Sequence, residues 1–173
     1  MEELIDLAKI LAPAALVLYL AYLLVRSFLN NQLEEIRQRM TQKGQEVAMP
    51  IRLQAYERVC LLLERVAPDN LIPRLNNSEY TAGQFRQILL TEVREEFNHN
   101  LSQQVYMSDE AWSYVKSAVE DTLSMINEAG NNVESDEKSL ALAKKIFDLS
   151  IERKPDMHTT ALLFVKDEAR KLF

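Results

Sequence analysis

The chain has 173 residues, enough for one domain with its own core, and a formal net charge of −6. This acidic balance, with no cluster of Lys and Arg, argues against nucleic acid as the main partner, because nucleic-acid binding depends on neutralising phosphates. Only three glycines and five prolines are available for turns, and no alternating strand pattern is present, so the predicted fold class is all-α.

The N-terminal region contains an apolar stretch that predicts a transmembrane helix. Residues 10–25, ILAPAALVLYLAYLLV, carry no charge and no strongly polar side chain. About 20 apolar residues cross a bilayer, and apolar neighbours extend the stretch at both ends, where Lys9 and Arg26 can reach the headgroups. A cleaved signal peptide would need a basic start and small residues after the run, and a core helix would be two-faced. Residues 1–28 are therefore predicted to be an extracytoplasmic N-terminus and membrane anchor.

The orientation of this anchor follows from the distribution of Lys and Arg around it. Before the stretch there is only Lys9, whereas Arg26, Arg37, Arg39 and Lys43 follow it. Because basic residues near a span stay in the cytoplasm, we expect the N-terminus outside and the rest of the chain in the cytoplasm.

A heptad seam follows the anchor in residues 29–48. Its apolar positions recur at spacings of four, three and four, at Leu29, Leu33, Ile36 and Met40. This pattern predicts that the membrane helix continues into the cytoplasm to about Gly44. Three partners fit such a juxtamembrane seam: the chain's own domain, a second copy in a homo-oligomeric coiled coil, or another membrane protein.

Residues 49–173 are predicted to form a cytoplasmic bundle of about five helices. The chain is expected to restart as a helix at Met49-Pro50, since proline is favoured in a first turn, and to stop before Pro68. The following segment, residues 68–77, is rich in turn-forming residues and is expected to be a loop packed onto the bundle.

The remaining helix starts are marked by capping residues. Thr81 and Gln84 have capping-box spacing and open a helix that should reach about residue 106. Ser108 opens a second helix and Ser135 a third, which Pro155 closes. The last helix begins with Asp156 or Thr159 as its cap.

Apolar residues at helical spacing define the expected core faces. In the first two helices these are Ala55, Tyr56, Val59, Leu62, Leu63 and Val66, then Phe85, Leu89, Val93, Phe97, Leu101 and Val105. In the later helices they are Trp112, Val115, Val119, Leu123 and Ile126, then Leu140, Ala143, Phe147 and Ile151, then Ala161, Phe164, Val165 and Leu172. Cys60 and Leu61 widen the first face. As the single thiol, Cys60 cannot form an internal disulfide, which suits a reducing compartment.

One pair of residues has the spacing of a metal site. Glu96 and His99, with two glutamates nearby, resemble half of a carboxylate-bridged di-iron centre, which needs a second Glu-x-x-His pair. The other histidine, His158, has no glutamate three residues before it. A surface histidine beside helix carboxylates is the simpler interpretation. We therefore predict no cofactor, no metal and no small-molecule substrate, and a metal-dependent enzyme using His99 is only a remote alternative.

A second local feature is the segment 97–106, FNHNLSQQVY, which we call the amide-rich segment. Its outward positions carry amides, an imidazole and a hydroxyl where other helices carry charges. The candidate partner-docking residues are Asn98, His99, Asn100, Gln103 and Gln104. An internal polar contact within the bundle is the alternative interpretation, which we favour for Asn100, next to Leu101 on the apolar stripe, while we favour docking for Gln103 and Gln104.

Residues 95–112, EEFNHNLSQQVYMSDEAW, together with the single N-terminal span, resemble an uncharacterised family of small membrane-anchored proteins of Bacteroidota bacteria. The resemblance covers most of the chain. It implies a setting in the bacterial inner membrane, and it carries over no activity and no functional residues.

The expected function is that of a non-enzymatic, membrane-anchored interaction module. We expect a subunit or accessory factor of a larger inner-membrane complex, with a membrane-tethered adaptor that recruits soluble proteins or peptides in a helical groove as the alternative. The expected partners are the lipid bilayer and other membrane or cytoplasmic proteins, with a homo-oligomer as a further alternative.

Overall fold

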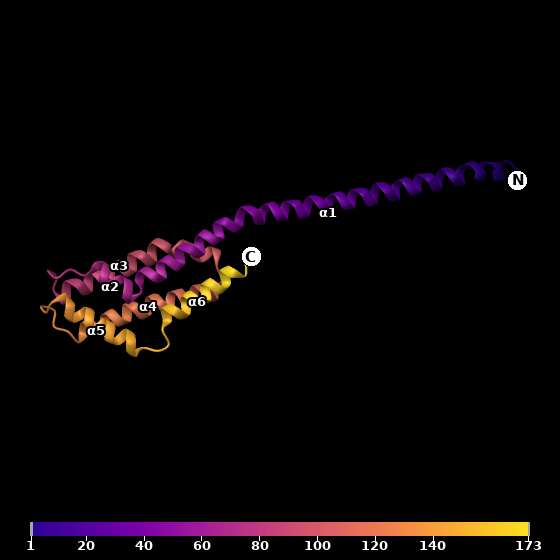
Figure 1. Ribbon diagram of the computed structural model, residues 1–173. Coiled ribbons are helices and arrows are strands. Elements are labelled where there is room, and N and C mark those ends of the chain that lie inside the picture. The colour runs from indigo at the N-terminus through magenta and orange to yellow at the C-terminus, as the bar shows by residue number, and fades with distance from the viewer. Residues whose placement is uncertain (1, 173) are drawn as a thin grey trace. The chain divides into compact units, whose positions relative to one another are not determined.

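The computed structural model describes residues 2–172, with side chains described for residues 16–30, 32–36 and 46–172. Within this part, the chain forms six α-helices and one short 3₁₀ helix, and the only extended pairing is an isolated bridge between Thr81 and Lys138. The all-α fold class is confirmed. The chain divides into two compact units, Met1–Ala48 and Met49–Phe173, which are described separately (Figure 1).

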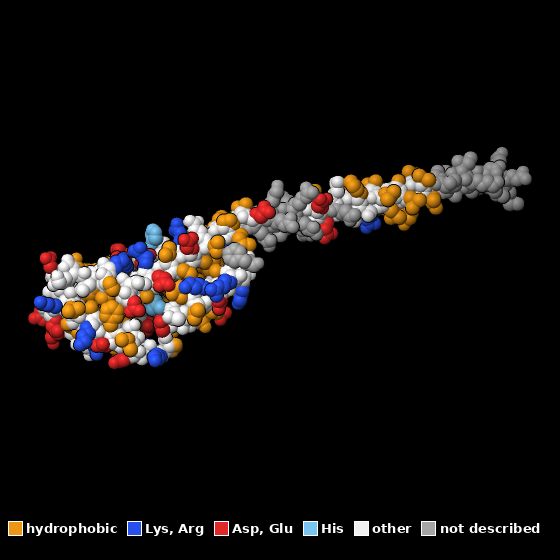
Figure 2. Space-filling model, in the orientation of Figure 1, with side chains coloured by type: hydrophobic (Ala, Val, Ile, Leu, Met, Phe, Trp, Pro, Cys, Tyr) orange, Lys and Arg blue, Asp and Glu red, His pale blue; other side chains and the backbone are white. Residues whose placement is uncertain are grey.

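The first unit is helical and belongs to α1, which spans Glu2–Val66. Large apolar side chains are exposed along its described part, as the orange side chains of Figure 2 show. Within the residues that have described side chains, none of the helices combines the length and apolar composition that crossing a bilayer requires. Residues 10–15 of the predicted span lie outside that set. Of the heptad seam, Leu29, Leu33 and Ile36 are exposed, and the side chain of Met40 lies outside the described residues.

The expected end of this helix near Gly44 and the restart at Met49-Pro50 are wrong, because α1 continues through both positions. A lone glycine costs a helix only about 1 kcal/mol relative to alanine, and Gln, Glu, Ala and Met around it are good helix formers. Once a helix is nucleated, each further residue adds a hydrogen bond. The proline removes one such bond and its ring clashes with the preceding turn, at a cost of about 3 kcal/mol, so its place inside α1 goes against the usual helix preference.

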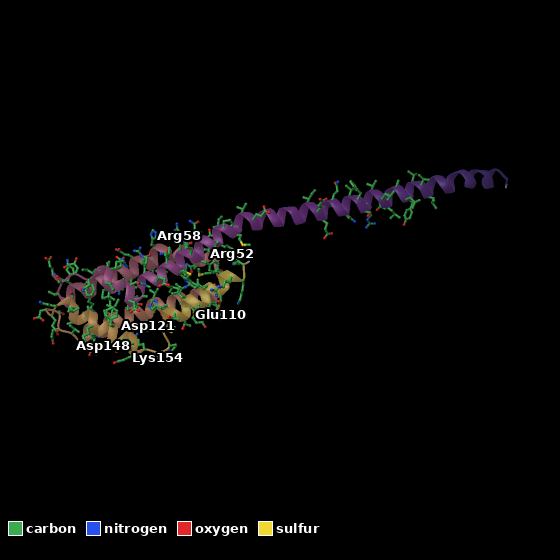
Figure 3. The ribbon with its side chains drawn as sticks, viewed as in Figure 1. Arg52, Arg58, Glu110, Asp121, Asp148 and Lys154 are labelled. Atoms are coloured by element: carbon green, nitrogen blue, oxygen red, sulfur yellow. The ribbon has the colours of Figure 1, made fainter. Side chains whose placement is uncertain are left out.

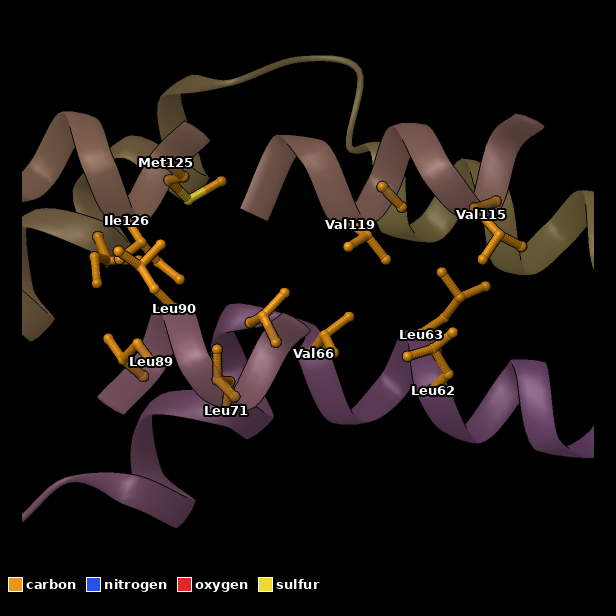
Figure 4. Close-up of a cluster of buried hydrophobic side chains, with 14 of the residues drawn as sticks. Leu62, Leu63, Val66, Leu71, Leu89, Leu90, Val115, Val119, Met125 and Ile126 are labelled. Carbon is orange, nitrogen blue, oxygen red and sulfur yellow. The ribbon is translucent and has the colours of Figure 1, made fainter. Parts of the chain in front are cut away.

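The second unit is a helical bundle built around α4. It contains the C-terminal part of α1 and the elements α2 (Pro68–Leu75), α3 (Ala82–Asn100), η1 (Leu101–Tyr106), α4 (Asp109–Asn131), α5 (Ser139–Glu152) and α6 (Met157–Arg170). Helix α4 contacts α3, α5 and α6. Leu62, Leu63 and Val66 of α1 and Leu71 of α2 belong to the same buried cluster as Val115 and Val119 of α4 (Figure 4).

The helix starts follow from their capping residues. Oγ1 of Thr81 accepts from the backbone N–H of Gln84 at 3.2 Å, and the Gln84 side chain accepts in return from the Thr81 N–H at 3.1 Å, so the predicted capping box is confirmed. Ser108 caps α4 by accepting from the N–H of Ala111 at 3.1 Å. The cap of α6 is Asp156, of the two residues proposed from the sequence.

The segment 68–77 is not the loop we expected. It contains helix α2, whose Leu71 and Ile72 are buried. Pro68 stands at the start of this helix, where its fixed φ suits the first turn and its missing N–H is not needed. The expectation that this segment packs onto the bundle is confirmed, since its apolar side chains enter the core.

The predicted faces of two elements also need correction. The third helix changes from α to 3₁₀ after Asn100, and a 3₁₀ helix has three residues per turn, so Leu101 and Val105 do not continue the stripe and are exposed. Helix α5 begins at Ser139 rather than Ser135, because the carbonyls of Ser135 and Glu137 accept hydrogen bonds from the first turn of α3.

Helix α5 buries a stripe that shares only its middle with the predicted one: Ala143 is buried and Phe147 packs against the core, as predicted. Leu140 and Ile151 are 68% and 74% exposed, whereas the buried residues of this helix are Ser139, Leu142, Ala143, Ile146 and Leu149. Both stripes have helical spacing, so periodicity alone does not choose between them. Leu61 of α1, expected to widen the core face, is also exposed.

Candidate functional site

The amide-rich segment lies at the junction between α3 and η1. Asn98 and His99 are exposed at the end of α3, and Gln104 is exposed on η1. Gln103 is half-buried, and its Nε2 lies 3.3 Å from Oγ of Ser102, to which it donates. These four predicted docking residues are therefore accessible from one short stretch of chain, and docking itself stays a prediction.

Asn100 has a different role, because it is only 5% exposed. Its Nδ2 donates to the backbone carbonyl of Glu96 at 2.9 Å. A side chain that donates to a carbonyl four residues earlier competes with the hydrogen bonds of the α-helix. The backbone changes to 3₁₀ turns at this point, where the Leu101 N–H donates to the Asn98 carbonyl. Asn100 therefore makes an internal contact that shapes the junction.

A groove lies between η1 and the start of the bundle portion of α1. Its volume is about 370 Å³, and its lining residues are Ile51, Gln54, Ala55, Arg58, Ser102, Gln103, Val105 and Tyr106. The backbone carbonyl of Tyr106 accepts a hydrogen bond from Nε of Arg52 at 3.3 Å, which ties η1 to α1. Of the five predicted docking residues, only Gln103 lines this groove.

The groove combines exposed apolar side chains with a single charge. Val105 is 78% exposed, and Ile51 and Tyr106 are also classed with the exposed large hydrophobic residues. Arg58 is the one charged lining residue, and it makes no hydrogen bond or ion pair with any other residue whose side chain is described. Arg52 and Arg58 both extend from α1 (Figure 3).

A polar network around Glu168 of α6 holds this end of the bundle together. The Glu168 carboxylate accepts hydrogen bonds from the Tyr56 hydroxyl at 2.6 Å, from the backbone N–H of Ser108 at 2.9 Å and from the Ser108 hydroxyl. Burial by itself would raise the pKa of Glu168, but these bonds and nearby Arg52 outweigh burial and leave its pKa below the usual value. The network joins α1, the start of α4 and α6, and α1 forms one wall of the groove.

A second polar group lies inside the bundle. His158 is 6% exposed, and its Nε2 lies 2.6 Å from Oγ1 of Thr122 on α4. Its Nδ1 is buried and has no hydrogen-bond partner among the described residues. A cavity of about 60 Å³ next to it is lined by Asp69, Asp121, Arg153 and Asp156, among others. Burial lowers the pKa of His158, although Asp156 and Asp121 act in the opposite direction.

Two of the glutamates near His99 are engaged in ion pairs. Glu92 pairs with Arg74 at 2.6 Å, and Glu96 pairs with Arg65 at 3.0 Å. Among the residues that the structure describes, no group of three or more His, Cys, Asp or Glu side chains is placed to hold a metal ion. His99 itself is exposed, and its role stays a prediction.

A family model described as "Family of unknown function (DUF7935)" matches residues 2–172. The chain belongs to this family. Membership in DUF7935 therefore extends over nearly the whole chain, and the family description assigns no activity. No curated protein and no solved structure gives a significant match.

Proposed function

We propose that this DUF7935 protein is a non-enzymatic, membrane-anchored interaction module. The N-terminal part of α1 anchors the chain in the bacterial inner membrane, with its N-terminus outside, and the helical bundle of residues 49–173 binds another protein in the cytoplasm. In this role the chain is a subunit or accessory factor of a larger membrane complex.

One observation carries the membrane part of the proposal. The large apolar side chains between Leu16 and Val25 are exposed all around α1, from 40% for Leu23 to 72% for Leu18 and Leu24. Contiguous apolar surface of this kind marks a protein or membrane interaction site. A helix that is apolar on every side is suited to lipid rather than to the edge of a core, and the sequence continues the apolar run back to Ile10.

The groove favours the alternative in which the chain is a membrane-tethered adaptor. A groove of about 370 Å³ between α1 and η1 offers a place for a peptide or helix of a soluble protein. The two functions differ in the stability of the complex. A subunit should elute with its partner in constant stoichiometry from mild detergent, whereas the partner of an adaptor should be removed by salt.

The anchor is tested by membrane fractionation of the full chain and of a Leu18→Arg variant. We expect the full chain to stay in membranes after an alkaline carbonate wash. Leu18→Arg should release it, because an arginine in the middle of a span costs about 2.5–3.5 kcal/mol on insertion scales. Deleting residues 1–28 should release a soluble and helical protein.

Leu61→Arg is the matched control, because Leu61 is 54% exposed on the bundle portion of the same helix. This variant should remain in the membrane fraction. If the wild-type chain is removed by carbonate, or if both arginine variants behave alike, residues 10–25 are not an anchor.

A further inference from the structure

We propose that the groove between α1 and η1 binds an amphipathic helix of a different protein, which presents an apolar stripe and a carboxylate to Arg58. This inference rests on the proposed role as an interaction module, and it names the chemistry of the partner. It identifies Arg58 and Val105 as the residues that select and anchor that partner.

The apolar part of the partner follows from the groove walls. Ile51 and Ala55 line it from α1, and Val105 and Tyr106 line it from η1. Val105 is 78% exposed, so its side chain has little of the chain packed over it. Two helical walls with apolar side chains between them suit the helix-in-groove mode of recognition, in which apolar residues at positions i, i+3, i+4 and i+7 enter the groove.

The carboxylate of the proposed partner is inferred from the charges that line the groove. The chain carries a formal net charge of −6, yet no acidic residue lines the groove. Arg58 is its only charged lining residue and has no partner among the described side chains. A guanidinium presents paired N–H donors that match a carboxylate, and Gln54, Ser102 and Gln103 add uncharged hydrogen-bonding groups beside it.

The same charges argue against a second copy of this chain as the occupant. In a two-fold symmetric dimer centred on this groove, the same patch of both copies meets, so groove faces groove. That surface offers no carboxylate, and it would add a second arginine. The complementary partner is therefore a different protein.

The test uses two synthetic helical peptides that share one leucine stripe and differ only in one central residue, Glu or Lys. Binding of each peptide to the full chain in zwitterionic lipid nanodiscs is measured by fluorescence anisotropy, with empty nanodiscs as the background. We expect the Glu peptide to bind about tenfold more tightly than the Lys peptide, because an arginine–carboxylate contact replaces an arginine–lysine repulsion. Arg58→Glu should reverse this preference.

Val105→Asp tests the apolar wall. It should weaken binding of the Glu peptide by about tenfold or more, because it places a carboxylate at the position that the apolar stripe must contact. Ile151→Asp is the matched control, since Ile151 is 74% exposed on α5 and does not line the groove. It should leave the affinity unchanged, and both variants should keep the wild-type thermal midpoint.

Several outcomes would overturn the proposal. These are equal affinity for the two peptides, no binding of either, or a preference that Arg58→Glu leaves unchanged. Dimerisation of the full chain that Val105→Asp abolishes would make a second copy the occupant instead. The carbonate wash reports on the anchor and does not involve the groove, so a failed anchor and a failed groove are separate results.

Discussion

His158 couples the packing of α6 to pH. The ring is 6% exposed and makes one hydrogen bond, to Thr122, and Nδ1 has no acceptor among the described residues. Protonation would add a second N–H donor in this buried site, where the Leu63 backbone, Asp156 and Asp121 favour the charged ring. The charged groups around the neighbouring cavity are Asp69, Asp121, Asp156 and Arg153. Burial nevertheless dominates, and the pKa of His158 lies below its usual value of 6.5.

The sign of the pH effect follows from this lowered pKa. The unfolded chain binds the proton more readily than the folded chain, so this contribution is fully present above pH 6.5 and is lost as the pH falls through that value. Between pH 7.5 and 5.5 we expect His158 to account for a loss of up to about 1.4 kcal/mol in the free energy of unfolding, measured by urea titration.

Two substitutions identify the source of that loss. His158→Gln should remove it, because the amide does not titrate, while His99→Gln, at the exposed histidine, should retain it. Equal pH dependence of the wild-type and His158→Gln proteins would assign the effect to other groups. Asp156 and Glu168 affect stability in a lower pH range. Their pKa values are lowered in the folded chain, so the stability that they contribute is lost as the pH falls below the usual carboxylate pKa.

At the scale of elements, α3 and α4 approach each other closely where Gly130 meets Arg86. A Cβ added at Gly130 would lie 2.5 Å from Cδ and 2.8 Å from Nε of Arg86. Arg86 is half-buried, and its Nη2 donates to Oδ1 of Asn127 at 2.9 Å. The glycine therefore leaves room for this arginine side chain, whose outer part would have to shift if a Cβ were added.

Gly130→Ala should destabilise the bundle by roughly 1–3 kcal/mol through overpacking, although alanine is the better helix former by about 1 kcal/mol. In an Arg86→Ala background the same substitution should become neutral or stabilising. Thermal or urea unfolding of the two single variants and the double variant measures this coupling. Equal effects of Gly130→Ala in both backgrounds would show that Arg86 moves aside freely.

Sequence reasoning identified elements where local chemistry marks them. Thr81 and Ser108 mark the starts of their helices in the sequence, because a capping hydrogen bond joins residues only a few positions apart. It did not identify α2, because Pro68 and Pro73 are as typical of loops as of a helix that begins with proline. In α5, two apolar stripes share one helix, and only packing against α2, α3 and α4 selects the buried one.

The groove was predicted only in part for a related reason. Gln103 stood out because amides on an outward helix face are unusual, but the α1 wall carries no such local signal. The contact between Arg52 and Tyr106 joins residues 54 positions apart, and the spacing of apolar residues along a helix contains no information about such a pair. Ile51 was detectable only as an apolar residue outside the stripe that begins at Ala55.

At the scale of the whole molecule, the core belongs to one unit. Every buried apolar side chain among the described residues lies between Ala55 and Val165, within the unit Met49–Phe173. Helix α1, Glu2–Val66, supplies residues to both units. The bundle therefore depends on the last part of α1 for its core and has no buried apolar side chain, among those described, in the first unit.

This arrangement predicts where the chain can be shortened. Residues 49–173 alone should unfold cooperatively, with a thermal midpoint close to that of the full chain. Residues 67–173 should not fold, because they lack the buried Tyr56, Val59, Leu62, Leu63 and Val66. Each such side chain contributes about 1.5–3 kcal/mol on burial. The loss of all five therefore removes a free energy similar to the net stability of a whole domain, which is roughly 5–15 kcal/mol. Circular dichroism melting of the two fragments measures this directly.

A folded 67–173 fragment would show that α1 is dispensable to the core, and an unfolded 49–173 fragment would show that the first unit supports the core.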